Sequence, residues 1–596
     1  MSEKKGLAQN IEWDLSDLYE SADSSKFQND KEYVLKMADR FAESYHSKVN
    51  LLDASGMKEA LEQYETILDV LGKLGSFAYL RWTTNTEDSS YGKLVQEMNE
   101  LSSQVHQKLL FFELEWTHVQ EDQAEKLINH PELKGYRHYL ETSRLYKPYR
   151  LEEKEEKILS AKSVTGRNAW NRYFDETIGA HRFELDGETL TEQQVLSKLH
   201  EPDRDLRRRA SDSMTTGLQE MNRSLTFIFN TLLADKHTND KLRGYPHWLK
   251  SRNLANEIQD HSVDALIDSV TGSYDLVQRY YRLKRNLLGY DELYDYDRYA
   301  PLLSSKEEIG WQQAKETVLE AYNEFHPQLA DIANQFFENN WIDAAIKPGK
   351  RGGAYSASTV PSVHPYVFMN YDGKVRDVQT LAHELGHGVH QYLSRQQGVL
   401  QSGTPLTTAE TASVFGEMLV FQKLKRQLSN EREKLALLLG KIDDSIATVY
   451  RQVSMNRFEN AIHTARREEG ELDSDRFSEL WVQTQKDLYG DSVTITDNYR
   501  IWWSYIPHFL HVPGYVYAYA FGELLVLSLY QQYQQSENGF ADTYMQLLKA
   551  GGSDWPENLV SPLGVDINSP DFWNTGIGAI EEMIKEAELL AQQIQN

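Results

Sequence analysis

Apolar residues recur at three- and four-residue intervals over long stretches of the chain, which is the spacing of an amphipathic helix. Residues 57–82 and 90–116 show this pattern most clearly, and proline is scarce, with 15 in 596 residues. We therefore expect a mainly α-helical protein. Residues 349–377 break the pattern, because they are rich in glycine, serine, aromatic and β-branched residues and contain an Asp-Gly turn signal. That composition predicts one or two short strands.

The chain is longer than one compact core normally organises, so we expect two or more lobes. No Pro/Ser-rich linker or low-complexity segment marks a boundary. The stretch 199–214 carries a proline and a charge cluster and then opens another long helical region. We place the boundary there, which gives an N-terminal helical lobe over residues 1–200 and a second region over residues 201–596.

Composition narrows the possible chemistry. The chain has no cysteine, which excludes disulfides, thiolate metal sites and cysteine nucleophiles, so any metal must be held by histidine, carboxylate or water. The formal net charge of −27 argues against nucleic acid as a partner. The apolar run from Leu524, in the C-terminal half, is too short to span a bilayer, and the first residues lack the apolar core of a signal peptide. We expect a cytoplasmic protein without a membrane partner.

The decapeptide LAHELGHGVH, residues 381–390, carries the clearest chemistry. Residues four apart on a helix share a face, so His383 and His387 can direct two imidazoles at one metal ion. Glu384 lies roughly 100° around the helix and can reach an attacking water without binding the metal. This is the His-Glu-x-x-His arrangement of metallopeptidases. The alternative is a buried histidine pair satisfied by hydrogen bonds. His390 lies too far along the helix axis to share the ion, and is expected either to contact a ligand residue or to line the cleft.

A third ligand is expected to be a carboxylate on a following helix, and the segment 403–424 offers Glu410 and Glu417. Glu410 could instead form a Thr-x-x-Glu capping box with Thr407. Glu417 could be a solvent-facing residue or the hydrogen-bond partner of a ligand histidine. Spacing alone favours Glu410, because it is nearer the helix start and is surrounded by small residues, but does not exclude Glu417.

The chain resembles the oligoendopeptidase F family, which is related to thimet oligopeptidase and neurolysin. The resemblance is carried by LAHELGHGVHQ, AETASVFGE and IPHFLHVPGYVYAYAFGELL, with IEWDLSDLYES and KRGGAYS before them, and it covers essentially the full length. It implies one zinc ion per chain, bound by His383, His387 and Glu410, with Glu384 activating water. It also implies an almost wholly helical fold in which two lobes enclose a deep substrate channel, with a small β element beside the zinc helix and the catalytic region in residues 201–596. Such a channel would admit short flexible peptides.

An aromatic segment follows near the C-terminus. The resemblance implies that a histidine and tyrosines of this region stabilise the oxyanion of the tetrahedral transition state, a role that needs hydrogen-bond donors. A helix starting at Pro513 would place Tyr515 and Tyr519 on one face and point Tyr517 elsewhere. The chain has PGY where thimet oligopeptidase relatives have GGY. The histidine that matches the family's could therefore be His508 or His511. The predicted catalytic residues are His511 and Tyr519, and the predicted substrate-binding residues are His508, Tyr515 and Tyr517. The alternative is an aromatic stripe that serves only as core.

An endopeptidase must hold its substrate extended beside the metal. The short strand predicted around residues 363–371 could pair with a peptide by strand addition. Gly352 and Gly353 are predicted to bind substrate by allowing close backbone approach, although they could simply turn the chain.

The sequence therefore predicts a zinc metallo-oligoendopeptidase acting on short peptides. Two alternatives stay open. One is a dipeptidyl carboxypeptidase of the same superfamily, and the other is a non-catalytic peptide-binding scaffold with a structural metal.

Overall fold

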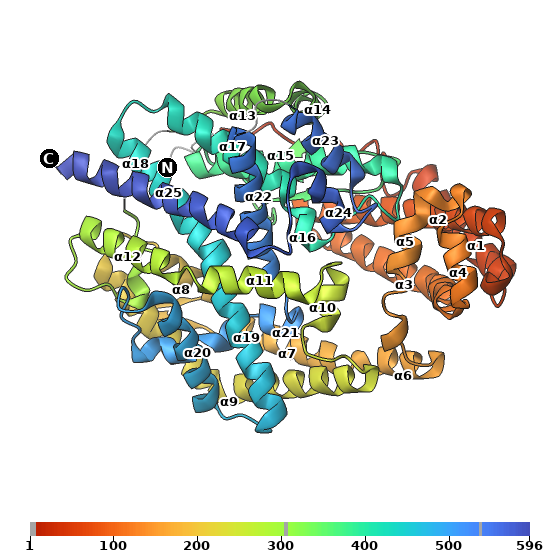
Figure 1. Cartoon of the computed structure of the whole chain (residues 1–596), viewed down its shortest axis with the longest axis horizontal. Coiled ribbons are helices and arrows are strands. Elements are labelled where there is room, and N and C mark those ends of the chain that lie inside the picture. The colour runs from red at the N-terminus through yellow and green to blue at the C-terminus, as the bar shows by residue number, and fades with distance from the viewer. Residues whose placement is uncertain (1–6, 303–307, 536–538, 596) are drawn as a thin grey trace. The chain divides into compact units, whose positions relative to one another are not determined.

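The computed structural model describes residues 7–302, 308–535 and 539–595, and most of these residues are helical (Figure 1). The mainly α-helical prediction is confirmed. Two compact units are present, each built from three separate stretches of the chain. Unit 1 comprises Met1–Lys147, Lys306–Gln427 and Gln532–Asp566, and unit 2 comprises Pro148–Ser305, Leu428–Gln531 and Ile567–Asn596. The stretch 199–214 falls within unit 2. The division into residues 1–200 and 201–596, and the channel between lobes, stay predictions.

Unit 1 consists of helices and one small sheet. Its helices are α1 (Ser25–Tyr45), α2 (Ala54–Thr84), α3 (Ser89–His118), α4 (Glu121–Ile128), α5 (Arg137–Thr142), α13 (Trp311–Phe325), α14 (Pro327–Glu338), α15 (Val375–Ser394), α16 (Leu406–Ala409), α17 (Thr411–Gln427), α23 (Phe540–Ala550) and α24 (Pro556–Val560). Helices α1, α2 and α3 pack together, and α15 packs against α13, α14, α17 and α23.

The sheet of unit 1 confirms the strands predicted for residues 349–377. Its order is β3 (Ile342–Asp343), β5 (Tyr366–Phe368), β4 (Tyr355–Ala357), with β3 parallel and β4 antiparallel to β5. The predicted site of strand addition at residues 363–371 is wrong, because β5 lies there and is paired on both sides. The edge strands are β3 and β4.

Unit 2 is also helical, with one hairpin. It contains α6 (Glu153–Ser163), α7 (Arg167–Ala180), β1 (Phe183–Leu185), β2 (Glu188–Leu190), α8 (Glu192–Lys198), α9 (Arg204–Arg243), α10 (Lys250–Ala255), α11 (Asp260–Thr271), α12 (Tyr274–Leu288), α18 (Glu431–Ser445), α19 (Arg451–Glu468), α20 (Ser474–Tyr489), α21 (His508–His511), most of α22 (Tyr517–Gln535) and α25 (Pro570–Gln595). In the described residues, no helix combines the length and apolarity needed to cross a membrane.

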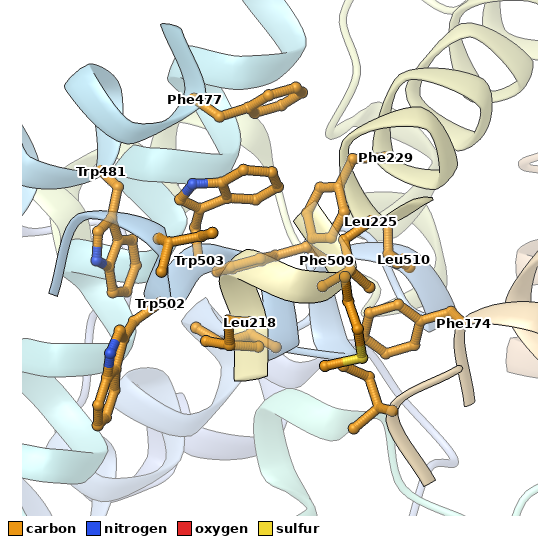
Figure 2. Packing of buried hydrophobic residues seen from close by; sticks show 14 of the residues in the cluster. Phe174, Leu218, Leu225, Phe229, Phe477, Trp481, Trp502, Trp503, Phe509 and Leu510 are labelled. Carbon is orange, nitrogen blue, oxygen red and sulfur yellow. The ribbon is translucent and has the colours of Figure 1, made fainter. Parts of the chain in front are cut away.

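An aromatic core in unit 2 fixes the short helix α21 (Figure 2). Phe509 and Leu510 are buried in it together with residues of α9 and α20. The ring of Trp503 stacks on Phe477 at 4.6 Å and meets Phe229 edge-on at 4.8 Å. Burial of each large apolar side chain contributes about 1.5–3 kcal/mol. The two middle residues of α21 therefore anchor the helix, and the histidines at its ends are held in place.

Candidate metal centre

Helix α15 carries the His-Glu-x-x-His motif, and hydrogen bonds to Asp377 stabilise its N-terminus. The carboxylate of Asp377 accepts hydrogen bonds from the backbone N–H groups of Lys374 (3.0 Å) and Asp372 (2.9 Å). These bonds satisfy donors that a helix start leaves free, and the negative charge is favourable there. The apolar face of the helix, which includes Leu381, Leu385 and Val389, is buried. The helix begins at Val375, two residues before Asp377.

Two glycines let neighbouring side chains and backbone approach α15. A Cβ added at Gly386 would lie 2.4 Å from the backbone oxygen of Ala412 and 2.6 Å from the Cα of Ser413, both on α17. A Cβ at Gly388 would lie 2.7 Å from the ring of Phe336 on α14. Only glycine permits these contacts, and the close approach of α17 brings Glu410 beside the motif.

Substitution of Gly386 by alanine should separate α15 from α17. The added methyl group meets backbone and cannot be relieved by a side-chain rotation, so we expect the free energy of unfolding to fall by about 1–3 kcal/mol. Metal affinity should fall as well, because the ligands come from both sides of this contact. Thermal unfolding and metal titration measure the two effects. Gly75→Ala on α2 is the control, because a Cβ there meets nothing within 4 Å; it should raise stability by up to about 1 kcal/mol. Equal stabilisation by both substitutions would contradict the steric argument.

The three side chains predicted as metal ligands lie together. The Oε2 atom of Glu410 is 3.4 Å from Nε2 of His383 and 3.3 Å from Nε2 of His387. One ligand atom from each of the three residues falls within 4.8 Å of the others, and all three residues are half-buried. Among the described residues this is the one group of three or more histidine and acidic side chains that could hold a metal ion.

Glu417 lies behind the ligand set. Nδ1 of His383 lies 3.3 Å from Oε2 of Glu417 and can donate a hydrogen bond to it. That bond leaves Nε2 of His383 free to face Glu410 and His387, which is how an outer carboxylate orients a metal-binding imidazole. The structure therefore separates the two acids that spacing left open, with Glu410 among the possible ligand atoms and Glu417 behind His383.

Glu410 sits at the junction of α16 and α17. It caps the C-terminus of α16, and its carboxylate accepts a hydrogen bond of 2.7 Å from the hydroxyl of Ser413. Thr407 lies inside α16 and is buried, so the Thr-x-x-Glu capping box considered for Glu410 does not describe this helix start. Glu410 is therefore available for a ligand role.

Electrostatics keep the cluster charged. Burial alone would raise the pKa of Glu410, but the hydrogen bond and charge of His387 lower it to about 2. Burial lowers the pKa of His383, and the hydrogen bond to Glu417 together with the nearby carboxylates outweighs burial and raises it to about 9. Both shifts follow from the attraction between the carboxylates and the imidazoles, which lie close together.

Glu384 borders the cluster without joining it. It is buried, which raises its pKa, while His383 and His387 oppose the shift. The backbone of Ser356 on β4 has a smaller effect, which lowers the pKa of Glu384. Together with His387, it lines a cavity of about 610 Å³ within unit 1. His390 also lines this cavity, as expected from its position on the helix, and burial lowers its pKa to about 4.

Strand β4 forms another side of the same cavity, and the two glycines precede it. Ala354, Tyr355 and Ser356 are among the lining residues. A Cβ at Gly352 or Gly353 would meet nothing within 4 Å, and Gly353 has a φ of +85°, a conformation that favours glycine. The carbonyl of Gly353 accepts a hydrogen bond of 3.0 Å from the side chain of Asn370. Gly353 therefore turns the chain into β4, and Gly352 leaves open space beside it.

The aromatic segment belongs to unit 2. The histidine that lies beside Tyr519 is not the one that was predicted. The hydroxyl of Tyr519 lies 3.4 Å from Nε2 of His508, and the rings of Tyr515 and Tyr519 are 5.0 Å apart. His511 instead lies 3.0 Å from the carboxylate of Asp175. The structure thus brings His508, Tyr515 and Tyr519 into one group and leaves His511 outside it.

Tyr517 points into the interior. It is fully buried, and its hydroxyl donates to Asn253 (2.9 Å) and accepts from Asn256 (2.8 Å). This position leaves it no surface for a substrate, so the prediction that it binds one is without support. Helix α22 begins at Tyr517 itself, so the helix start predicted at Pro513 is wrong. Gly514 has a φ of +77° and interrupts the helical geometry between them.

Comparisons of sequence and of structure both find peptidases. A profile of peptidase family M3 matches residues 197–579, and one described as oligopeptidase F matches residues 115–183. The chain is 28% identical to oligopeptidase PepF of Bacillus subtilis, covering 98% of this chain and 87% of that protein. It is 27% identical to group B oligopeptidase PepB of Streptococcus agalactiae, covering 92% of both. The crystal structure of oligoendopeptidase-F from Enterococcus faecium has a TM-score of 0.73 at 22% identity, covering 95% of this chain and 99% of that one, and so has the same fold.

Proposed function

Because the chain belongs to peptidase family M3 and is a metalloendopeptidase, we propose that it is a zinc-dependent oligoendopeptidase that hydrolyses internal bonds of short peptides. The observation that carries the proposal is the convergence of His383, His387 and Glu410 on one point, next to the cavity that His387 and Glu384 line. The names of the Bacillus and Streptococcus relatives, both oligopeptidases, support short peptides as substrates.

The donor set fits zinc. Tetrahedral zinc with bonds of about 2.0–2.1 Å separates its donor atoms by about 3.3 Å. The approaches of Glu410 to His383 and His387, at 3.4 and 3.3 Å, agree with this separation. Two imidazoles and one carboxylate are also the ligands of known catalytic zinc sites, which keep a fourth position open. His383, His387 and Glu410 would hold the ion.

Glu384 is the general base in this proposal. When bound, zinc acts as a Lewis acid that acidifies water and polarises the substrate carbonyl. Glu384 takes a proton from the attacking water as its oxygen bonds to the carbonyl carbon, and it passes that proton to the departing amine as the C–N bond breaks. Burial suits this exchange, because it raises the pKa of Glu384 toward the working pH.

We assign the oxyanion donors to the group formed by His508, Tyr515 and Tyr519. His508 replaces His511 in this assignment, because His508 faces Tyr519 while His511 faces Asp175. Burial lowers the pKa of His508, which favours a neutral ring that donates one hydrogen bond. The hydroxyl of Tyr519 is the second donor. Donors of this kind stabilise charge that develops in the transition state.

The substrate backbone pairs with β4 in this proposal. Of the two edge strands, β4 lines the cavity with Glu384 and His387, so its free edge can accept an extended peptide. The open space at Gly352 leaves room for the peptide where it passes the turn before β4. Main-chain pairing gives affinity that depends little on side chains, so broad sequence tolerance is expected.

A peptide with an acetylated N-terminus and an amidated C-terminus tests the endopeptidase assignment. We expect cleavage at an internal bond at a rate similar to that of the unblocked peptide, because β4 and the metal site recognise backbone. Mass spectrometry of the products locates the bond. A chelator should abolish both reactions, which controls for a contaminating metal-independent peptidase. If only free C-termini are processed, two residues at a time, the chain is a dipeptidyl carboxypeptidase and the proposal fails.

A further inference from the structure

The segment 512–516, between α21 and α22, is held in place by polar contacts within unit 2. Arg167 donates to the backbone oxygen of His511 at 2.6 Å, and Arg252 on α10 donates to that of Pro513 at 3.5 Å. The backbone N–H of Gly514 donates to Oε1 of Glu459 on α19 at 2.9 Å. This segment links His508 at the start of α21 to Tyr515 and Tyr519, so these contacts determine how that group is arranged.

Packing alone does not fix the segment. A cavity of about 200 Å³ lies beside it, and its lining includes Leu510, Pro513, Arg252 and His463. Atoms that border a cavity lose packing partners on that side. The hydrogen bonds of the segment therefore contribute more to its fixed conformation than they would in a close-packed interior.

Glu459 differs from the other contacts because it is a buried acid. It is 0% exposed, and its Oε2 atom has no hydrogen-bond partner in the described part of the chain. Its partner, Gly514, is closely surrounded, since a Cβ added there would lie 2.4 Å from the side chain of Leu249. A buried acid with one oxygen bonded and the other unpaired is stable only in its neutral form.

The surroundings favour that neutral form. Burial raises the pKa of Glu459 to about 8, against the hydrogen bond from Gly514 and the positive charge of Arg252. One turn along α19, His463 is also buried, and burial lowers its pKa far enough to keep it uncharged. At neutral pH the carboxyl is therefore protonated and accepts the Gly514 hydrogen bond through its carbonyl oxygen.

We propose that Glu459 is a positioning residue that, through Gly514, holds His508, Tyr515 and Tyr519 in the arrangement used for catalysis. The assignment rests on the proposed function of that group. Glu459 itself is buried and touches no substrate. Ionisation would place an unpaired charge in the interior, and relief of that charge requires the segment to open toward solvent.

Activity should therefore fall as the pH rises through about 8 and Glu459 loses its proton. Glu459→Gln keeps the acceptor for Gly514 and cannot ionise, so we expect kcat/KM at pH 7 within about twofold of wild type and a decline shifted to higher pH. Glu459→Leu removes the acceptor and leaves a buried N–H unpaired, so we expect kcat at pH 7 to fall about tenfold. Profiles of kcat/KM against pH, with a blocked peptide as substrate, measure both. Glu468→Gln, an exposed acid on the same helix, is the matched control and should follow wild type.

Thermal unfolding supplies a readout that does not depend on activity. The pKa of Glu459 is raised from 4.5 unfolded to about 8 folded, so the folded state holds a proton that the unfolded state releases between these values. Its contribution to stability therefore declines from about pH 4.5 to pH 8 and is level above pH 8. The Tm of Glu459→Gln relative to wild type should rise between pH 5 and pH 8.

Two sets of results separate this inference from the proposed function. If Glu459→Gln keeps the wild-type alkaline decline and its Tm difference is constant with pH, Glu459 does not act as proposed, whatever Glu384 does. If Glu384→Gln retains full turnover, the proposed function fails. The Tm of Glu459→Gln as a function of pH still tests the protonation of Glu459, because it does not depend on activity. Should Glu459→Leu not fold, the glutamine variant decides the question alone.

Discussion

Exchange of Glu384 for glutamine should lower kcat/KM for a blocked peptide by about 10²–10⁴-fold, the usual contribution of a general base. Glutamine retains the shape of the side chain and an oxygen that can accept a hydrogen bond. It cannot take a proton from water. Because Glu384 lies outside the three-residue cluster, bound zinc should be unchanged.

Steady-state kinetics and the zinc content of the same preparation measure this prediction. A non-catalytic peptide-binding scaffold with a structural metal would show no dependence on Glu384, because no proton is transferred. A glutamine variant that cleaves the peptide at the wild-type rate would therefore exclude the mechanism. Loss of turnover accompanied by loss of zinc would instead place Glu384 among the ligands and contradict the geometry described here.

Replacement of Glu410 by glutamine should remove the metal and, with it, peptide hydrolysis. The carboxylate supplies the negative charge at the point where it meets His383 and His387, and a neutral amide is a much poorer zinc ligand. We expect zinc affinity to fall by more than about 100-fold, because loss of an outer partner alone typically costs about 10–100-fold. Competition for zinc against a chelator of known affinity measures the change.

Glu417→Gln is the matched control for this experiment, since the two acids are seven residues apart and approach the same histidine. Its amide oxygen can still accept the hydrogen bond from Nδ1 of His383 but carries no charge. Zinc affinity should fall by no more than about 10–100-fold, and the protein should remain active with zinc in excess. Greater loss from Glu417→Gln than from Glu410→Gln would reverse the two roles.

The metal motif could be predicted from sequence because its geometry is local. Helical periodicity places His383 and His387 on one face whatever surrounds them. The choice between Glu410 and Glu417 could not be made from spacing, because both lie on the partner segment and their roles depend on how α17 meets α15. That contact is set by Gly386, whose importance appears only when the backbone of Ala412 and Ser413 is seen beside it.

Other parts of the fold could not be predicted from sequence, for similar reasons. Pro513 is a good helix-starting residue, yet α22 begins at Tyr517, because Gly514 adopts a left-handed conformation and bonds to Glu459 on a distant helix. Residues 349–377 showed strand composition, but which strand lies at the edge is decided by pairing with β3, outside that segment. His508 and His511 were indistinguishable until Asp175, far away in sequence, was seen beside His511. The interleaving of both units across three chain stretches is likewise a long-range property.

The most direct test is to add zinc stepwise to the metal-free protein while measuring the initial rate of peptide cleavage. Hydrolysis should be absent at the outset, increase in proportion to added zinc, and become constant at one ion per chain. Full cleavage before any zinc is added, or a rate that does not change with the amount of zinc bound, would contradict the account. Either result would show that the cluster of two imidazoles and a carboxylate is not the catalytic site.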